Sequence, residues 1–231
     1  MPPPIPVELR QHDPCWAENA RREAARLTAA IGEVIVAVHH VGSTAIPGIR
    51  AKPILDLMPV VFSHPEFENF RSTLEGLGYA WWGEYGLPGR RYCTLDDPLT
   101  GSRCVQLHCY ERGSPEITRH LAFRDYLVAR PDLAREYEIE KCRCQKLHPL
   151  DSHAYADCKS GWIRQVEADA LSAGFVRLGD KRYVRRKGGK FTKSQDDVGR
   201  SLAADRRRKA RTRAKKGEGD RGDQKRRRAR R

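Results

Sequence analysis

The chain has 231 residues, of which 44 are lysine or arginine and 30 are aspartate or glutamate. The positive excess is concentrated at one end: residues 181–231 carry a net charge of +17, whereas residues 1–180 carry −3. A basic domain that wraps nucleic acid over its whole surface is therefore not needed to explain the charge. About 180 residues are enough for one compact domain that buries roughly 70% of its unfolded surface. We expect one domain over residues 1–180, followed by a basic tail, residues 181–231.

Two further features of the composition bear on where the protein works. The sequence has no run of about 20 apolar residues, the length that a membrane-spanning helix needs, and its first residues lack the pattern of a secretory signal. Its seven cysteines fit no recognisable disulfide framework, which favours free thiols in a reducing compartment. We therefore expect a cytoplasmic protein with free cysteines and no membrane partner. Zinc is not expected at Cys142, Cys144, His148 and His153, because one residue between the two cysteines is too few for a zinc-binding turn.

The amino-terminal half alternates predicted helices and strands. An apolar-periodic stretch predicts a helix over residues 14–31, with Asp13 as its N-cap and Gly32 at its end. Continuous β-branched residues predict a buried strand over 34–38, which ends in a glycine-bearing turn at 39–44. The elements expected next are a strand over 54–61, a helix over 65–76, a Gly-rich stretch over 76–89, and strands over 90–95 and 103–110.

The remainder of the domain has the pattern of helices. They are predicted from Ser114 onward, with Pro115 suited to the first turn, over residues 131–146 and over residues 153–171. Together the elements predict an α+β fold, in which a mixed or antiparallel sheet is backed by helices and followed by a helical half.

Asp56 is the most informative single residue. Because side chains alternate across a strand, Asp56 and Met58 should share one face, and Leu55 and Leu57 the other. A buried and isolated carboxylate is energetically costly, so Asp56 is expected at the mouth of its strand, facing a metal, a cation or hydrogen-bond donors. The alternative is a purely structural salt bridge to Lys52 or to an arginine.

A small polar turn precedes this strand. Gly42, Ser43 and Thr44 follow the first predicted strand, and Asp56 lies on the next one. A glycine and small hydroxyl groups allow backbone N–H groups to approach phosphate oxygens. A carboxylate on the next strand can hold a magnesium ion that bridges those oxygens. The turn and Asp56 together predict a site for phosphate and magnesium.

Several short motifs occur together between residues 10 and 170, in the order HDPCW, HHVGSTAIPGIRAKPILDL, RRY, VQLHCY, FRDYL and YADCKSGWI. This set resembles the GrpB family of nucleotidyltransferase-like proteins. The resemblance implies the fold of the DNA polymerase beta nucleotidyltransferase superfamily, a small mixed sheet backed by helices. It also implies a nucleoside triphosphate as substrate and Mg²⁺ as cofactor. Many GrpB members have no assigned reaction, and some occur fused to dephospho-CoA kinase.

The chain departs from the superfamily pattern at the second carboxylate. Active nucleotidyltransferases carry two carboxylates separated by one residue, and the second position here is Met58, whose thioether cannot replace a hard oxygen ligand. A third carboxylate belongs on a later strand, where the polar face offers Gln106, His108 and Tyr110. These residues favour one metal held by Asp56 with Gln106 or His108, or a metal-free nucleotide site. Asp56 and His108 are the candidate catalytic residues.

Two of the predicted helices supply candidate phosphate-binding side chains. Arg124 shares a helix face with apolar residues, so it either contacts a phosphate or is a buried partner of Asp125 or Asp56. Tyr155 and Lys159 stand four residues apart on one helix face and match a Tyr and Lys motif of the family. The match implies a phosphate contact for Lys159 and stacking or hydrogen bonding for Tyr155. The alternative is a solvated lysine beside a core tyrosine.

Lys52, Arg91 and His40 are further candidates. Lys52 lies in the loop before Asp56, where it either neutralises a triphosphate or holds a carboxylate. Arg91, on the strand predicted over 90–95, likewise either contacts a phosphate or holds a carboxylate. His40 is either a site residue or a donor that braces the glycine-bearing turn.

The basic tail contains few apolar residues, so burial cannot offset the entropy of ordering it, and disorder is expected. Such a tail binds nucleic acid or another polyanion through counterion release. Three functions remain open at this point. They are nucleotidyl transfer from a nucleoside triphosphate to a small acceptor, nucleotide binding without transfer, and association with RNA through the tail.

Overall fold

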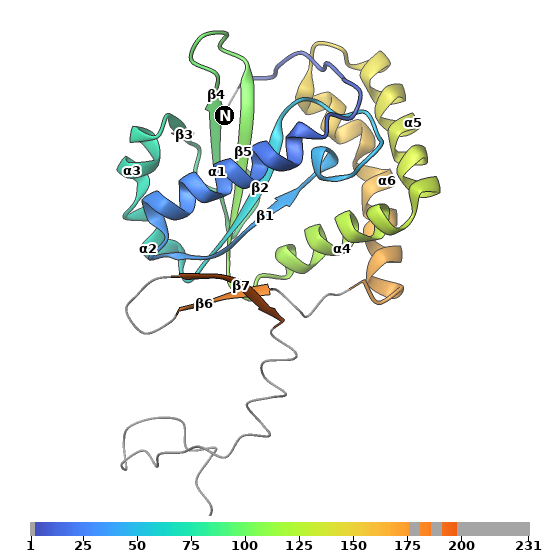
Figure 1. Ribbon diagram of the computed structural model, residues 1–231. Coiled ribbons are helices and arrows are strands. Elements are labelled where there is room, and N and C mark those ends of the chain that lie inside the picture. Colours follow the sequence, from blue (N-terminus) through green and yellow to red (C-terminus); the bar gives the residue numbers. More distant parts are fainter. Residues whose placement is uncertain (1–2, 176–180, 186–190, 198–231) are drawn as a thin grey trace, which may run out of the picture. The chain divides into compact units, whose positions relative to one another are not determined.

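The computed structural model describes residues 3–175, 181–185 and 191–197, and the chain divides into two compact units, Met1–Arg177 and Leu178–Arg231. The first unit contains a five-stranded mixed sheet in the order β1-β2-β5-β4-β3 (Figure 1). Its strands are β1 (Ile35–Val41), β2 (Leu55–Val61), β3 (Tyr79–Trp81), β4 (Arg90–Asp96) and β5 (Arg103–Glu111). The central pair β2 and β5 is parallel, and the other neighbouring pairs are antiparallel.

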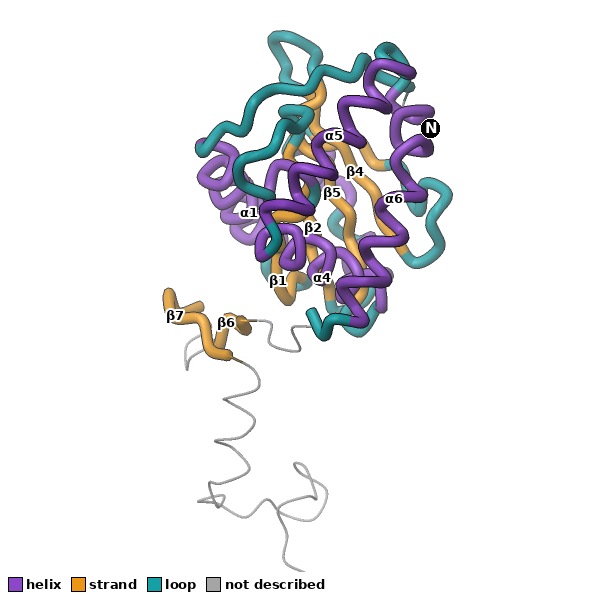
Figure 2. The backbone as a smooth tube through the Cα atoms, turned by 90° about the vertical axis from the view of Figure 1, so that its right-hand side faces the viewer, coloured by secondary structure: helices purple, strands orange, loops and turns teal. Residues whose placement is uncertain are grey.

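Helices cover both faces of this sheet (Figures 1 and 2). They are α1 (Cys15–Ile31), α2 (His64–Glu68), α3 (Arg71–Gly76), α4 (Pro115–Ala129), α5 (Pro131–Leu147) and α6 (Ser152–Ser172), with a short 3-10 turn, η1 (Ser43–Ala45). The predicted α+β fold with a helical carboxyl-terminal half is confirmed.

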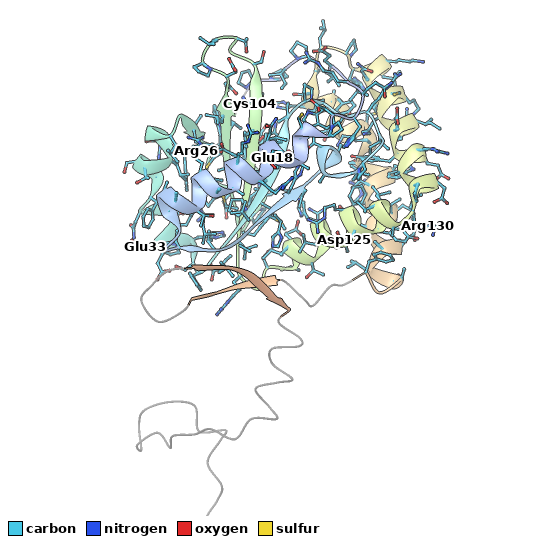
Figure 3. All side chains as sticks on the ribbon, in the orientation of Figure 1. Glu18, Arg26, Glu33, Cys104, Asp125 and Arg130 are labelled. Carbon is cyan, nitrogen blue, oxygen red and sulfur yellow. A yellow bond between two sulfur atoms is a disulfide. The ribbon has the colours of Figure 1, made fainter. Side chains whose placement is uncertain are left out.

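The first helix forms where the sequence predicts it, but its N-cap residue is Pro14 rather than Asp13. The Asp13 carboxylate accepts a hydrogen bond from the Cys15 backbone N–H at 2.8 Å, which satisfies one of the free donors of the first turn. The helix ends at Gly32. Arg26, labelled in Figure 3, donates to the Leu77 carbonyl oxygen at 3.1 Å and so fastens α1 to the end of α3.

The alternation of side chains along β2 divides the core into two clusters. Leu55 and Leu57 face α1 to α3, in a cluster that also holds Trp16, Leu27, Phe67, Leu74 and Leu107. Met58 and Val60 face α4, in a cluster with Ala37, Val41, Tyr110, Ile117 and Leu121. The predicted division of β2 into two faces is therefore confirmed, and Asp56 belongs to the face that α4 covers.

Two local predictions were wrong. The first strand continues through His39 and His40 to Val41, because those residues pair with Met58, Leu57 and Asp56 on β2. The helix predicted over 65–76 is two helices, α2 and α3, which are separated at Asn69 and Phe70, the latter with ψ of 11°. Within the Gly-rich stretch, to which no element was assigned, β3 pairs with β4 at the edge of the sheet.

Side-chain caps begin two helices of the helical half, α4 and α6. The Ser114 hydroxyl accepts from the Glu116 backbone N–H at 3.3 Å at the start of α4. The Asp151 carboxylate accepts from the backbone N–H groups of His153 and Ala154 at the start of α6. The three helices α4, α5 and α6 pack on one another, which fixes where their polar side chains emerge.

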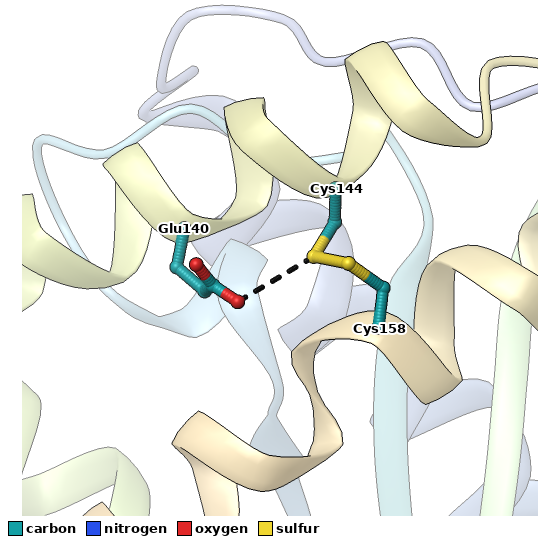
Figure 4. Close-up of side chains that lie close together, drawn as sticks. All are labelled: Glu140, Cys144 and Cys158. Carbon is teal, nitrogen blue, oxygen red and sulfur yellow. Dashed lines mark hydrogen bonds between the residues drawn. A yellow bond between two sulfur atoms is a disulfide. The ribbon is translucent and has the colours of Figure 1, made fainter.

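A disulfide corrects the expectation that every cysteine is free. Cys144 on α5 and Cys158 on α6 are bonded, with their Cα atoms 5.8 Å apart, and the Glu140 carboxylate lies 3.6 Å from the Cys144 sulfur (Figure 4). No sequence pattern predicts this pair, because only helix packing brings the two positions together. Sulfur atoms joined in a disulfide are not the thiolates that zinc requires. The other five cysteines are free, as expected.

The second unit contains two strands, β6 (Lys181–Arg185) and β7 (Phe191–Asp197), which pair in an antiparallel sheet. Disorder was expected over these residues, and the difference follows from the β-branched and aromatic residues in both strands, among them Tyr183 and Phe191. The rest of the predicted tail, residues 198–231, lies outside the described residues. Among the described helices, none is long and apolar enough to cross a membrane.

Candidate functional site

A pocket of about 320 Å³ opens on the face of the sheet that carries Asp56. Its walls come from the end of β1, the η1 turn, the loop before β2, the strands β2 and β5, and the helices α4, α5 and α6. The volume falls in the range of pockets that hold small ligands. The predicted site residues that line it are Gly42, Ser43, Thr44, Lys52, Asp56, Gln106, His108, Tyr155 and Lys159.

Asp56 and Gly42 are in close contact at the floor of the pocket. Asp56 is the second residue of β2, and β1 brings Val41 opposite to it. Gly42 has φ of 70° and ψ of −170°, a backbone conformation that is essentially restricted to glycine. A Cβ atom at this position would lie 2.2 Å from the Asp56 Oδ2 atom. The glycine therefore leaves the space that the Asp56 carboxylate occupies.

The Asp56 carboxylate is kept ionised by its neighbours. Burial acts to raise its pKa, but a hydrogen bond from His108, together with the charges of Lys52 and Lys159, holds that pKa below its ordinary value. The His108 Nε2 and Asp56 Oδ1 atoms are 3.4 Å apart. Gln106 is the residue of β5 that pairs with Asp56. The arrangement thus presents a carboxylate, an amide and an imidazole to one point of the pocket.

Two lysines and a tyrosine flank Asp56. The Nζ atoms of Lys52 and Lys159 lie 5.5 Å and 5.4 Å from the centre of the Tyr155 ring. Burial lowers the pKa of Lys52 to about 8, and the nearby charge of Lys159 acts in the same direction while Asp56 opposes it. Two ammonium groups beside one carboxylate leave a net positive charge, which suits an anionic ligand. We call Lys52, Asp56, Tyr155 and Lys159 the lysine end of the pocket.

His40 contacts the glycine-bearing turn and does not line the pocket. Its Nε2 atom lies 2.9 Å from the Thr44 Oγ1 atom, and it is not among the residues that line the pocket. Burial lowers the pKa of His40 to about 4, so the imidazole is neutral near pH 7. The Ser43 hydroxyl donates to the Tyr137 hydroxyl at 3.4 Å, which ties the same turn to α5.

The two candidate arginines lie outside the pocket. The Arg124 guanidinium donates to the His40 carbonyl oxygen at 2.9 Å and to the carboxylate of Asp125, a residue labelled in Figure 3, at 2.8 Å. Of its predicted roles, the structure therefore shows the buried partner of Asp125. Arg91 pairs with Glu68 at 2.5 Å and with Glu84 at 3.5 Å. A phosphate-binding role for either arginine is not supported by this geometry.

Met58 stands at the position where the sequence resemblance would place a second carboxylate, and it is buried. Its side chain is fully inaccessible and packs in the apolar cluster beneath α4. It does not line the pocket, and Tyr110, the third polar residue predicted on β5, is buried in the same cluster. The pocket consequently receives one strand carboxylate, Asp56.

The burial of Met58 makes a prediction about stability. Met58→Asp should lower the free energy of unfolding by about 3 kcal/mol or more, because it places an unpaired carboxylate in an apolar cluster. Met58→Leu, which preserves volume, should cost less than about 1.5 kcal/mol. Urea denaturation followed by circular dichroism measures both. Equal stability of the two variants would show that position 58 is open to the pocket.

Helix packing adds pocket residues that the sequence analysis did not identify. They are Arg119, His120 and Phe123 on α4, Tyr137 on α5, and Ile163 and Glu167 on α6. A sequence signal existed for the last two, since Tyr155, Lys159, Ile163 and Glu167 recur every four residues and so share one helix face. No comparable signal marks Tyr137, which stacks on Trp162 with ring centres 5.0 Å apart.

The fold and the pocket together define a class: an α+β protein with a polar, small-molecule-sized pocket at one end of a mixed sheet. The model of the GrpB protein family matches residues 6–169. The chain belongs to this family. The structure is similar to that of the conserved protein GrpB from Enterococcus faecalis, with 33% identity and a TM-score of 0.67 over 73% of this chain and 99% of the other.

Curated relatives support the same assignment. The UPF0157 protein YqkA of Bacillus subtilis is 39% identical over 71% of this chain and 47% of its own length. The chain therefore spans about half the length of that relative. The glutamate-rich protein GrpB of Alkalihalophilus pseudofirmus is 31% identical over 69% of this chain and 93% of its own length. A dephospho-CoA kinase of Mycolicibacterium paratuberculosis is 31% identical over 70% of this chain and 45% of its own length.

Proposed function

We propose that the pocket binds a magnesium complex of a nucleoside triphosphate and transfers its nucleotidyl group to a small acceptor. The observation that carries the proposal is the lysine end, where the charges of Lys52 and Lys159 help to keep Asp56 ionised beside the glycine turn. Lysines, turn backbone and a carboxylate-bound cation are the groups that proteins use for polyphosphates. The sequence resemblance to nucleotidyltransferases supports the same chemistry. The proposal includes a cytoplasmic location, where nucleoside triphosphates are available.

The donor set fits one magnesium ion. Asp56 supplies a hard carboxylate oxygen and Gln106 an amide oxygen, and Mg²⁺ usually keeps several waters besides one or two protein ligands. Such an ion neutralises phosphate charge and polarises the phosphoryl group. With Met58 buried, the residues do not provide the two carboxylates of a two-metal site.

The other residues have separable roles in this proposal. Lys52 and Lys159 hold the triphosphate, and the Gly42 turn lets the chain approach it closely. An acceptor oxygen attacks the α-phosphorus, the new O–P bond forms as the α–β P–O bond breaks, and pyrophosphate leaves. His108, held beside Asp56, takes the proton that the acceptor loses, a role to which imidazoles are well suited.

Nucleotide binding without transfer is the second candidate, and the buried Met58 favours it because it leaves Asp56 as the one strand carboxylate among the residues that line the pocket. Calorimetry of the full chain with Mg²⁺ and non-hydrolysable nucleotides tests binding. Pyrophosphate release from hydrolysable nucleotides, in the presence of pooled small acceptors, then separates transfer from binding alone. Absence of magnesium-dependent nucleotide binding would contradict both candidates.

The Lys52 pKa of about 8 predicts how binding depends on pH. As the pH rises from 7 to 9, Lys52 loses its proton in the protein without nucleotide. Lys52 must then take up a proton again before it can pair with a phosphate. Nucleotide affinity should therefore fall by up to about tenfold per pH unit above pH 8. Lys52→Arg keeps its charge throughout this range and should give a flatter curve. Calorimetric titrations at four pH values provide the measurement, and identical curves for the two proteins would exclude Lys52 as the titrating group.

We also propose that residues 181–231 bind nucleic acid or another polyanion independently of the pocket. Their net charge of +17 supports this, whereas residues 1–180 carry −3. Removal of these residues should abolish most RNA binding, and the full chain should lose affinity steeply between low and high salt. Fluorescence anisotropy with a labelled RNA across a salt series measures both effects. RNA binding that survives the truncation with the same salt slope would place the RNA site in the domain.

A further inference from the structure

The pocket continues along α6, away from the lysine end. Lys159, Ile163 and Glu167 all line it and lie on one helix face. Because an α-helix rises 1.5 Å per residue, the eight residues from Lys159 to Glu167 span about 12 Å. A ligand whose phosphates lie against Lys159 can therefore place another of its groups near Glu167.

The distal end of the pocket, formed by Arg119 and Glu167, contains an ion pair. The Arg119 guanidinium donates through Nε and Nη2 to Glu116, at 2.9 Å and 2.6 Å, and through Nη1 to the Oε1 atom of Glu167. One guanidinium thus serves two carboxylates, and the charge of the exposed Arg164, which also lowers the pKa of Glu167, acts less strongly than that of Arg119. His120 adds no positive charge near pH 7, because burial lowers its pKa to about 4.

Glu167 is the carboxylate of this group that lines the pocket, beside Arg119. It is 8% exposed and lines the pocket, whereas Glu116 does not. Burial raises the pKa of Glu167 against the opposing charge of Arg119, so the carboxylate is incompletely compensated. Phe123 and Ile163 supply apolar walls beside it. A group that donates hydrogen bonds would stabilise this carboxylate, whereas an acceptor group placed directly against the Glu167 oxygens would be disfavoured.

We propose that the distal end binds an amino group of the ligand, with Glu167 as the hydrogen-bond acceptor. The inference rests on the proposed function, because it assumes that phosphates occupy the other end. The amino group has two possible sources. It is either the exocyclic amine of an adenine or cytosine base, or an amine carried by the acceptor.

The test compares nucleotides that differ at the exocyclic group, by calorimetry of the full chain with Mg²⁺. ATP is compared with ITP, and CTP with UTP, since each pair exchanges an amine for a carbonyl. A base amine at Glu167 should make the amino member bind at least about tenfold more tightly. E167Q should reduce that preference to within about threefold. E116Q, the matched control on the same arginine, should keep it, and thermal denaturation checks that both variants fold.

An amine on the acceptor gives a different pattern. The two members of each nucleotide pair then bind equally. A primary amine such as spermidine binds to the nucleotide-loaded protein, and this amine binding is lost in E167Q and kept in E116Q. Nucleotide binding without selectivity and without Glu167-dependent amine binding would overturn this inference alone. Absence of any magnesium-nucleotide binding would overturn the proposed function as well. The wild-type comparison of the nucleotide pairs needs no variant, so a poorly folded E167Q does not prevent a decision.

Discussion

Asp56→Asn is expected to weaken magnesium-dependent nucleotide binding by about a hundredfold or more, equivalent to about 2.8 kcal/mol. The substitution keeps the shape of the side chain but removes the one strand carboxylate that lines the pocket. Without that charge, the pocket loses its magnesium ligand and Lys52 and Lys159 lose their shared counter-charge. Isothermal titration with and without Mg²⁺ measures the change.

The matched control for this experiment is Asp97→Asn. Asp97 lies in the turn between β4 and β5, where its carboxylate accepts from the backbone N–H groups of Leu99 and Thr100. An asparagine oxygen can accept the same hydrogen bonds, and the turn is not part of the pocket around Asp56. This variant should bind nucleotide as the wild type does. If Asp56→Asn retained wild-type magnesium-dependent affinity while folded, Asp56 would not be the metal ligand.

Local chemistry explains why the sequence could place residues of the lysine end close together. Alternation along a strand fixes the face that Asp56 shares with Met58, and the glycine turn lies directly after the preceding strand. The pairing of β1 with β2 then brings Gly42 and Asp56 together, with no need for information from distant helices. The start and stop signals of a helix, such as Asp13 and Gly32, are equally local, so the bounds of α1 were predicted to within one residue.

The distal end depends on how helices pack, which the sequence does not state. Arg119 and Glu167 are separated by 48 positions and meet only because α4 packs on α6. The same limit explains the disulfide between Cys144 and Cys158. It also explains Arg124, whose helix face was predicted as core or cleft but whose guanidinium reaches the His40 carbonyl on β1. Periodicity identifies a face, whereas the partner of that face requires the tertiary structure.

Gly42→Ala should be the most damaging single substitution of a small residue in the domain, because two separate costs coincide. The backbone conformation at Gly42 is essentially restricted to glycine and costs other residues about 1–3 kcal/mol. The added Cβ would also lie 2.2 Å from the Asp56 Oδ2 atom, so the carboxylate or the turn must move. Overpacking of this kind costs about 1–3 kcal/mol. We expect the free energy of unfolding to fall by about 2–5 kcal/mol and nucleotide binding to be lost.

Gly48 provides the control that separates these two costs. It also has a positive φ, of 79°, but a Cβ atom there would meet nothing within 4 Å. Gly48→Ala should therefore show the backbone cost alone, about 1 kcal/mol, and should bind nucleotide normally. Urea denaturation and calorimetry on both variants measure stability and binding. Equal effects of the two substitutions would mean that the contact between Gly42 and Asp56 does not matter, whereas loss of binding in Gly42→Ala alone would tie the position of the Asp56 carboxylate to the missing side chain of Gly42.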